Sequence, residues 1–297
     1  MNTGWLLTGA VGAAVALGGW VWLWRWRVAQ RFESSDAARR PRGANGVVIG
    51  AEEFFLRGTS DRAVLLLHGF NDTPQSMAYL GARLNAVGYT VHGLRLPGHG
   101  CSLPELAREA RAGAWREAVQ SAFTALHLEH RRVYVCGQSM GGALAVLLAA
   151  SHSEMPAVAL LAPFIGLEPR LGWQFRLARL SPAPYHKSLG GERSLHDPVA
   201  RRAALGPGIV TAQALLALRT IALDAQSVLG QVRVPTLYVQ STLDNRVSAA
   251  AGEKHYNAIQ ATDKEQLWLS GSGHIISADL ERDLVADRVI AWFERHL

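Results

Sequence analysis

One serine of the sequence stands in a setting typical of a nucleophile. Ser139 is the central residue of the motif Gly-Gln-Ser-Met-Gly at 137–141, which follows one apolar run and opens another. A serine in a tight strand-to-helix turn projects its hydroxyl above the sheet, where the positive end of the following helix stabilises a developing negative charge. The two glycines relieve the crowding of such a turn. The spacing therefore predicts a nucleophile rather than a serine that only caps a helix.

A serine hydroxyl needs a base to become a good nucleophile. Of the eleven histidines, His274 lies in a loop rich in Gly and Ser, residues 270–274, after the last predicted strand. We expect this flexible loop to bring His274 to Ser139. His186 and His196 fall in a segment discussed below as a cap, where they are candidates for substrate contacts. Five others lie in helical segments or at their ends and are expected at the surface: His127, His130, His152, His255 and His296.

An imidazole base needs a carboxylate that fixes its tautomer and stabilises the imidazolium. Asp244 lies in the loop after the apolar run of residues 236–240, and the order serine, aspartate, histidine along the chain is typical of one hydrolase architecture. The structural alternative for Asp244 is the N-cap of a helix beginning near Ser248. Asp224 and Asp263 are the rival carboxylates, but neither lies just past the carboxyl end of a predicted strand.

An oxyanion intermediate needs two hydrogen-bond donors. One is predicted to be the backbone N–H of Met140, directly after the nucleophile. The other is predicted to be the backbone N–H of Phe70, in the loop His-Gly-Phe that follows the apolar run of residues 63–67. We expect the side chain of His68 to be a structural hydrogen-bonding group. Because the sequence has no P-loop, dinucleotide fingerprint or His/Cys ligand cluster, no metal and no organic cofactor is predicted.

Predicted strands and helices alternate along the chain from Val47 onward, and these elements must position the candidate residues. Short apolar runs predict strands buried on both faces, and apolar residues three or four apart predict helices. The predicted strands are residues 63–67, 89–94, 132–136, 157–161, 236–240 and 266–269. The predicted helices are residues 74–87, 114–129, 142–150 and 280–296. This alternation predicts an α/β fold, with a mostly parallel sheet and helices on both of its faces.

The alternation breaks between Pro163 and Gly230. This interval contains Arg-rich helical pieces and several prolines but no convincing strand. We interpret residues from about 164 to about 230 as an inserted helical cap over the carboxyl edge of the sheet. A single catalytic domain, residues 47–297, then contains the cap.

Several features together resemble the α/β-hydrolase superfamily: the motif at 137–141, the loop at 68–70, the Leu-Pro-Gly-His-Gly turn at 96–100, Asp244 and His274. Within it, the chain resembles the branch of bacterial carboxylesterases, monoacylglycerol lipases and serine aminopeptidase hydrolases. The resemblance covers about Val47 to the end. It implies an α/β-hydrolase fold, a catalytic triad of Ser139, Asp244 and His274, and an oxyanion hole formed by the N–H groups of Phe70 and Met140.

The reaction expected from these residues is hydrolysis of a carboxylic ester through an acyl-enzyme, with a small-molecule ester or an acylglycerol as substrate. A thioesterase, an acyltransferase or a peptidase of the same fold are the alternatives among enzymes. From another class, a membrane-tethered ligand-binding module with negligible turnover is also considered. A serine at the turn argues against dehalogenase and epoxide hydrolase chemistry, because the resemblance implies an aspartate nucleophile for those enzymes of the superfamily.

An uncharged run precedes the predicted domain. Residues 5–24 comprise fifteen apolar residues, four glycines and Thr8. At 1.5 Å per residue in a helix, twenty residues span about the 30 Å of the hydrocarbon core of a bilayer. Tryptophans at both ends are typical of a membrane interface. We predict a single transmembrane anchor over residues 5–24, with a buried helix or a cleaved signal peptide as the alternatives.

The net charge of +6 is unevenly distributed. Residues 25–42 hold six arginines and two acidic residues, whereas residues 43–297 hold 24 basic and 22 acidic residues. The positive-inside rule then predicts a basic juxtamembrane linker over residues 25–46 and a single-pass membrane protein with a cytoplasmic catalytic domain. The nearly neutral body argues against a nucleic-acid partner. Two cysteines, Cys101 and Cys136, exclude a disulfide framework, and the sequence gives no indication of the oligomeric state.

Overall fold

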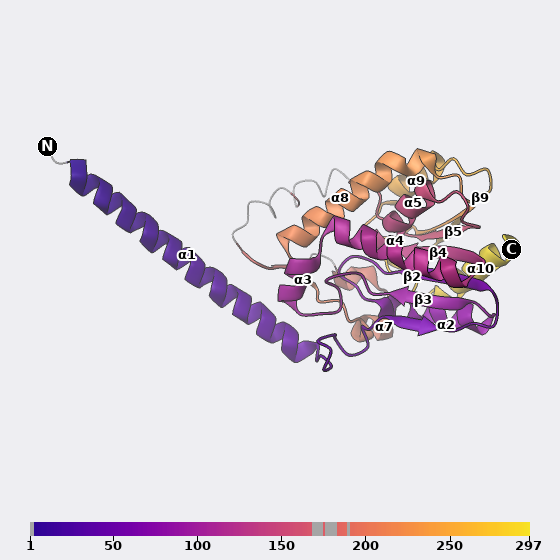
Figure 1. Cartoon of the computed structure of the whole chain (residues 1–297), viewed down its shortest axis with the longest axis horizontal. Helices are drawn as coiled ribbons and strands as arrows, with labels where there is room; N and C mark the ends of the chain where they lie inside the picture. Colours follow the sequence, from indigo (N-terminus) through magenta and orange to yellow (C-terminus); the bar gives the residue numbers. More distant parts are fainter. Residues whose placement is uncertain (1–2, 168–174, 176–182, 189–190) are drawn as a thin grey trace.

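A seven-stranded sheet runs through the body of the protein in the computed structural model, which describes residues 3–167, 175, 183–188 and 191–297 (Figure 1). The strand order is β1-β3-β2-β4-β5-β8-β9, and all neighbours are parallel except β1 and β3. The strands are β1 (Phe54–Leu56), β2 (Arg62–Leu67), β3 (Thr90–Leu94), β4 (Arg132–Gln138), β5 (Val158–Leu161), β8 (Thr236–Ser241) and β9 (Lys264–Leu269). The predicted mostly parallel α/β sheet is confirmed.

The central strands are buried on both faces, as their unbroken apolar sequences predict. In β2, Leu65 and Leu67 pack into one hydrophobic layer, and Val64 and Leu66 pack into the other. Residues alternate in this way because successive side chains of a strand point to opposite faces of the sheet. Each face therefore needs its own covering of helices.

Helices cover both faces of the sheet. One layer contains α3 (Leu103–Glu109), α4 (Ala112–Glu129), α5 (Met140–Ser151), α8 (Ala212–Val228) and α9 (Ala249–Ala258). The other contains α2 (Ala78–Ala86) and α10 (Arg282–Arg295). A fully buried tryptophan anchors each layer, Trp115 from α4 and Trp292 from α10. An apolar stripe on one side of each helix is what directs this packing.

The elements that sequence patterns missed are short. The edge strand β1 has only three residues, and its single partner is β3. Helix α3 has seven residues and begins in a capping box, in which Ser102 and Glu105 bind each other's backbone N–H groups. The predicted helix 74–87 begins as a 3-10 turn, η1 (Pro74–Met77), before α2.

The segment predicted as a cap has two structurally different parts. Residues 183–210 contain a small antiparallel pair, β6 (His186–Lys187) with β7 (Ile209–Val210), together with η2 (Gly191–Ser194) and α7 (Pro198–Ala203). The expectation of no strand there is wrong at this pair. Helix α8, by contrast, packs against α5 in the main core and ends in η3 (Leu229–Gln231). Helix α8 thus belongs to the main core, although it lies within the predicted cap. Residues 168–174 and 176–182 of the predicted cap lie outside the described residues.

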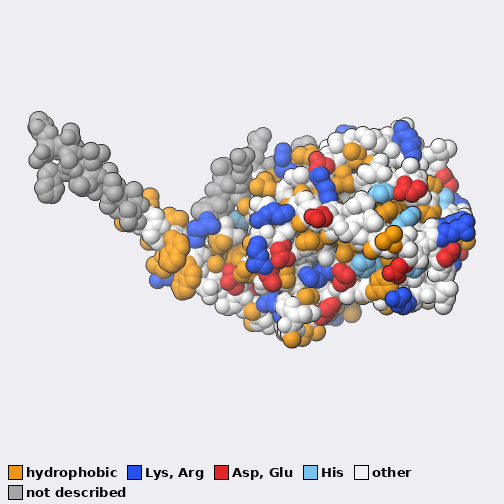
Figure 2. Space-filling model, viewed as in Figure 1, with side chains coloured by type: hydrophobic (Ala, Val, Ile, Leu, Met, Phe, Trp, Pro, Cys, Tyr) orange, Lys and Arg blue, Asp and Glu red, His pale blue; other side chains and the backbone are white. Residues whose placement is uncertain are grey.

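A single helix, α1 (Thr3–Arg39), extends from one end of the body (Figure 1). The segment predicted as a basic juxtamembrane linker, residues 25–46, is helical as far as Arg39. The exposed hydrophobic side chains of α1 include Trp20, Trp22 and Trp26. Figure 2 shows hydrophobic side chains on the described part of the helix that projects from the body.

The structure does not support the predicted transmembrane helix at residues 5–24. None of the helices that the structure describes has an apolar stretch long enough to span a bilayer. The physical reason lies in α1 itself: from Ala16, where its side chains are described, nine uncharged residues precede Arg25, and charged residues recur from there to Arg39. The predicted single-pass membrane location, on which the cytoplasmic placement of the catalytic domain rested, is therefore wrong.

The last turns of α1 pack onto the body. The carboxylate of Asp36 is fully buried and binds Arg40 at 2.7 Å and Arg42 at 2.6 Å. Arg40 also donates to the carbonyl oxygens of Leu205 and Cys101, at 3.2 and 3.4 Å. A buried ion pair with further hydrogen bonds fixes geometry more than it adds net stability. These contacts join the end of α1 to the segment before β7.

Candidate active site

Ser139 lies in a strained turn between β4 and α5. Its backbone has φ 57° and ψ −114°, a conformation that L-residues adopt rarely and that neighbouring structure must enforce. The two glycines of the motif make it possible: a Cβ on Gly137 would lie 2.2 Å from the carbonyl oxygen of Gly141, and a Cβ on Gly141 would lie 2.2 Å from that of Leu67. The turn is held further by a hydrogen bond from the Ser139 N–H to the Leu161 carbonyl at 2.9 Å.

The three side chains predicted as a triad meet in one hydrogen-bonded chain. The Oγ of Ser139 lies 2.7 Å from Nε2 of His274, and Nδ1 of His274 lies 2.7 Å from Oδ2 of Asp244. Asp244 follows β8 and His274 follows β9, so both loops leave the sheet at the edge where β4 ends. Parallel strands bring these distant residues together because their carboxyl ends share one edge.

The carboxylate of Asp244 is fully buried and has four hydrogen-bond partners. Besides His274, it accepts from Gln240 Nε2 at 2.8 Å and from the backbone N–H groups of Arg246 and Val247 at 2.7 and 2.9 Å. Burial by itself raises the pKa of a carboxyl, but attraction to His274 and these hydrogen bonds hold the pKa of Asp244 below its ordinary value. Asp244 is therefore ionised at neutral pH and can orient the imidazole. The N-cap alternative does not apply, because Ser248 caps α9.

Downstream carboxylates hold the loop that carries His274, which corrects the expectation of a flexible loop. Glu281 accepts from the backbone N–H groups of Ser270, Gly271 and Ser272, at 2.8 to 3.2 Å. Asp279 accepts from the N–H of Gly273 at 2.6 Å. Oriented backbone N–H groups around a carboxylate fix a loop much as a cap fixes a helix.

Gln138, the residue before the nucleophile, holds His274 from the other side. Its side chain is fully buried. The Nε2 group donates to the His274 carbonyl at 2.9 Å, and Oε1 accepts from the Ser277 N–H at 3.3 Å. The turn that carries Ser139 and the loop that carries His274 are thus fastened together on both sides of their contact.

The two residues predicted to supply oxyanion donors flank Ser139. Met140 is the first residue of α5, and the loop of Phe70 lies against the serine, since a Cβ on Gly69 would be 3.3 Å from the Cβ of Ser139. Among the described residues, neither the Phe70 nor the Met140 N–H donates a hydrogen bond. Their role in binding an oxyanion stays a prediction.

His68 is the structural hydrogen-bonding residue that its sequence position suggested. Its Nε2 accepts from the Leu96 N–H at 3.2 Å, so Nδ1 carries the proton and donates to the Gly69 carbonyl at 2.8 Å. Complete burial lowers its pKa well below the ordinary histidine value, and the neighbouring His99 lowers it further. A neutral imidazole with both nitrogens bonded to backbone has no site left for a substrate proton.

An aromatic cluster supports the loop of Phe70. The ring of Phe70 lies edge-on to His99 and to Trp115, with centroid distances of 6.2 and 6.3 Å. Trp115 donates from Nε1 to the Pro97 carbonyl at 2.8 Å. Such aromatic pairs contribute about 1 kcal/mol each beyond their buried area. The cluster therefore helps to fix the Phe70 backbone beside Ser139.

The other carboxylates and histidines considered for the site have different partners. Asp224 in α8 is paired with Arg116, and Asp263 is paired with Arg295 and His296. His196 is close to the site, but its Nδ1 is bonded to the Gly271 carbonyl at 2.8 Å. Within the described residues, no group of three or more His, Cys, Asp or Glu side chains converges as metal ligands would.

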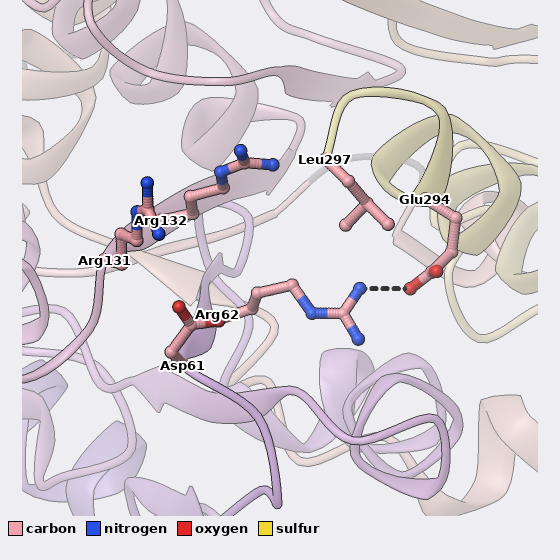
Figure 3. A pocket seen from close by; sticks show the side chains of 6 residues that line it. All are labelled: Asp61, Arg62, Arg131, Arg132, Glu294 and Leu297. Atoms are coloured by element: carbon pink, nitrogen blue, oxygen red, sulfur yellow. Dashed lines mark hydrogen bonds and ion pairs between the residues drawn. The ribbon is translucent and has the colours of Figure 1, made fainter.

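A pocket of about 320 Å³ lies at the opposite edge of the sheet, at the beginnings of β2 and β4 (Figure 3). Its lining is mostly charged: Asp61, Arg62, Arg131, Arg132, Glu294 and Leu297. Arg62 is bound to Glu294 at 2.7 Å. None of these six side chains is a nucleophile, so the pocket is separate from the chemistry at Ser139.

Sequence reasoning missed Asp72, Gln138, Asp279 and Glu281, although each holds a loop of the site. The residues that follow His274 gave a signal, because two acidic residues occur within seven positions of it. Asp72 is buried, accepts from Ser76 Oγ at 2.6 Å, and has its pKa raised to about 6 by burial. Its sequence, Asn-Asp-Thr-Pro, is equally typical of an exposed turn before a helix.

Comparison with known proteins identifies the family. The family model for serine aminopeptidase, S33, matches residues 58–281. The chain belongs to this family. It is 28% identical over 249 residues to a carboxylesterase of Bacillus subtilis, covering 84% of this chain and 98% of that protein. It is 27% identical over 250 residues to a thermostable monoacylglycerol lipase of Bacillus sp. strain H-257, covering 84% and 97%.

Solved structures agree with the family. A structure from work on the metagenome-derived lipolytic enzymes LipS and LipT has a TM-score of 0.76 at 30% identity, covering 84% of this chain and all of that one. The monoacylglycerol lipase of Paleococcus ferrophilus has a TM-score of 0.69 at 17% identity, covering 83% and 99%. The latter likeness concerns the fold alone. The expected α/β-hydrolase fold and the resemblance to carboxylesterases and monoacylglycerol lipases are confirmed.

Proposed function

We propose that this protein hydrolyses carboxylic esters through an acyl-enzyme, with Ser139 as nucleophile, His274 as base and Asp244 as the group that orients His274. The observation that carries the proposal is the continuous hydrogen-bonded chain from Ser139 through His274 to Asp244, with both links at 2.7 Å. Membership of a hydrolase family, with a carboxylesterase and a monoacylglycerol lipase among the relatives, supports an ester as substrate.

The first half of the reaction forms the acyl-enzyme. The Oγ of Ser139 attacks the ester carbonyl carbon while its proton moves to Nε2 of His274, and the carbonyl electron pair moves onto oxygen. The N–H groups of Phe70 and Met140 donate to this oxyanion. When the intermediate collapses, the bond to the alcohol oxygen breaks, and His274 returns the proton to the leaving alcohol.

The second half repeats these steps with water. Water attacks the acyl carbon, His274 takes its proton, and the carboxylic acid leaves as Ser139 regains the proton. Asp244 remains ionised throughout and stabilises the imidazolium in both halves, in agreement with its lowered pKa. Ser139, held in its strained turn, is thus the nucleophile of the first half and the leaving group of the second.

An acylglycerol or another small ester is the substrate class that we favour. The names of the two Bacillus relatives support it, because one is a carboxylesterase and the other a monoacylglycerol lipase. Thioesters, amides and alcohol acceptors are the competing substrates of a thioesterase, a peptidase or an acyltransferase. A series of p-nitrophenyl esters of increasing acyl length, assayed beside monoacylglycerols, matched thioesters and aminoacyl amides, separates these activities by kcat/KM.

The test of the mechanism is labelling of Ser139 by a fluorophosphonate together with Ser139→Ala. We expect the substitution to abolish labelling and to reduce kcat for p-nitrophenyl esters by about 10⁴-fold or more. Ser151→Ala is the matched control, because Ser151 is an exposed serine at the end of the same helix. If Ser139→Ala retains turnover, or if the wild type neither labels nor turns over, the proposal is wrong, and the latter result favours a ligand-binding module.

A further inference from the structure

A short segment of the predicted cap lies across both loops of the site. We define the strap as residues 194–197, from the last residue of η2 to the N-cap of α7. Its Ser194 carbonyl accepts from the Ile275 N–H at 2.9 Å, next to His274. Its Ser194 hydroxyl donates to Asn245 Oδ1 at 3.1 Å and accepts from Arg246 Nε at 3.3 Å, next to Asp244. The strap therefore contacts the neighbours of two of the three triad residues.

One carboxylate joins the strap to the loop of His274. Asp279 is fully buried. Its oxygens accept from the strap N–H groups of His196, at 2.9 Å to each oxygen, and of Asp197 at 2.7 Å. One of the same oxygens accepts from the Gly273 N–H at 2.6 Å, directly before His274. The Asp279 carboxylate also accepts a hydrogen bond from the Leu280 N–H at 2.9 Å.

The contact between strap and loop leaves no free space. A Cβ on Gly273 would lie 2.8 Å from the Ser194 carbonyl oxygen. The ring of His196 adds a link from Nδ1 to the Gly271 carbonyl at 2.8 Å. Because hydrogen bonds to a buried carboxylate are about twice as strong as neutral ones, a displacement of the strap is transmitted to the backbone at Gly273.

We infer that Asp279 is a positioning residue, which holds the imidazole of His274 in line with Ser139 and Asp244 by fixing the backbone before His274 to the strap. This inference rests on the proposed function and adds a residue to it. It also makes the alignment of the triad depend on the strap, a part of the segment that precedes α8. Asp279 touches no reacting atom, so its effect is on geometry and not on proton transfer itself.

The expected signature of Asp279→Asn is a loss in kcat with little change in KM. An asparagine keeps the shape but presents an NH₂ group to N–H donors, so the strap and the loop separate. A misplacement of about 1 Å at a catalytic group can cost about 100-fold, and we expect kcat to fall about 10- to 100-fold with KM within about threefold. Asp287→Asn is the matched control, because that exposed side chain of α10 binds Arg83 at 2.5 Å and belongs neither to the strap nor to the loop of His274.

A second readout follows the geometry without turnover. The proton on Nδ1 of His274, bound to Asp244, should give a downfield proton NMR resonance that His274→Ala removes. We expect this resonance to weaken or shift upfield in Asp279→Asn and to stay unchanged in Asp287→Asn. Should Asp279→Asn not fold, Ser194→Ala tests the same strap more mildly, with kcat expected to fall about three- to tenfold through its lost bonds beside Asp244.

An Asp279→Asn protein with wild-type kcat and an unchanged resonance would overturn the inference. If its thermal stability were reduced at the same time, Asp279 would have a merely structural role. If the wild type fails to turn over esters or to label, the proposed function fails, but the resonance still reports whether Asp279 positions His274.

Discussion

Two loops at the same edge of the sheet each carry a histidine, and they use it in opposite ways. In the loop after β2, His68 has both ring nitrogens bonded to backbone groups, the Leu96 N–H and the Gly69 carbonyl. In the loop after β9, His274 has both ring nitrogens bonded to side chains, those of Ser139 and Asp244. The partners of the ring, rather than its position at a strand end, distinguish the structural histidine from the predicted base.

The two loops also differ in the carboxylates that fasten them. Asp72 lies within its own loop and is so deeply buried that its pKa is raised to about 6, despite the hydrogen bond from Ser76. Glu281 lies downstream of its loop. Burial also opposes its ionisation, but the bonds from Ser272, Gly271 and Ser270 hold its pKa below the ordinary value. One loop therefore contains a carboxyl that resists ionisation, and the other is fastened by one that is stably ionised.

The largest expected difference between the two histidines is in catalysis. His274→Ala removes the predicted base, so kcat for p-nitrophenyl esters should fall about 10⁴-fold, whereas His68→Ala should lower it about 10- to 100-fold by loosening the backbone at Phe70. Steady-state kinetics on both purified variants measures this. Comparable losses in the two variants would remove the distinction drawn between the histidines.

The loss of stability should show the reverse order, with His68→Ala costing more than His274→Ala. His68→Ala leaves the Leu96 N–H and the Gly69 carbonyl buried without their partner and opens a cavity, so the free energy of unfolding should fall by about 2–4 kcal/mol. His274→Ala should cost about 1 kcal/mol or less, because Asp244 keeps its bonds from Gln240, Arg246 and Val247. Urea denaturation at pH 7 measures both values. A larger loss in His274→Ala would contradict the structural role of His68.

The difference in carboxyl ionisation predicts opposite pH dependences of stability. The pKa of Asp72 is raised from near 3.8 to about 6, so between these values the folded protein binds a proton that the unfolded chain releases. Its contribution to stability is therefore present below pH 4 and lost as the pH rises to 6, by at most about 3 kcal/mol. The pKa of Asp244 is lowered, so its contribution is present at neutral pH and lost as the pH falls through its folded pKa.

Two substitutions separate these contributions. In Asp72→Asn the decrease between pH 4 and 6 should disappear, with about 1 kcal/mol of added stability at pH 8 after the loss of weaker hydrogen bonds is counted. In Asp244→Asn part of the acid-induced loss should disappear instead. Urea midpoints measured from pH 3.5 to 8 give both curves, and an unchanged slope in Asp72→Asn would contradict the raised pKa.

The sequence predicted the parts of this site that local patterns determine. The turn at Ser139 depends on Gly137 and Gly141. A Cβ at either position would lie 2.2 Å from a backbone oxygen, so only glycine fits there. The inner strands β2, β4, β5 and β8 are buried almost throughout, because both faces of a parallel sheet are covered, whereas the edge strand β9 is only partly buried. Once these strands are parallel, the residues after them must share one edge, which is why the meeting of Ser139, Asp244 and His274 followed from their places in the chain.

Tertiary contacts determined the parts that sequence patterns missed. Asp279 and Glu281 hold the loop of His274 through bonds to backbone N–H groups, and their nearness to His274 in the sequence does not specify which N–H groups they bind. The three-residue strand β1 exists only because β3 pairs with it. Helix α1 was misjudged for a related reason: composition showed an apolar run and a basic run, whereas the continuity of the helix to Arg39 and the burial of Asp36 depend on packing against the body.

The smallest expected difference concerns the two glycines that lie beside the histidines. A Cβ on Gly273 would lie 2.8 Å from the backbone oxygen of Ser194, so Gly273→Ala must move the strap or the loop. A Cβ on Gly69 would meet the Ser139 Cβ at 3.3 Å, which a shift of a few tenths of an ångström relieves. We expect Gly273→Ala to lower the free energy of unfolding by about 1 kcal/mol more than Gly69→Ala does. Urea denaturation measures the difference, and an equal or opposite order would show that the loop of His274 yields more easily than its carboxylate bonds suggest.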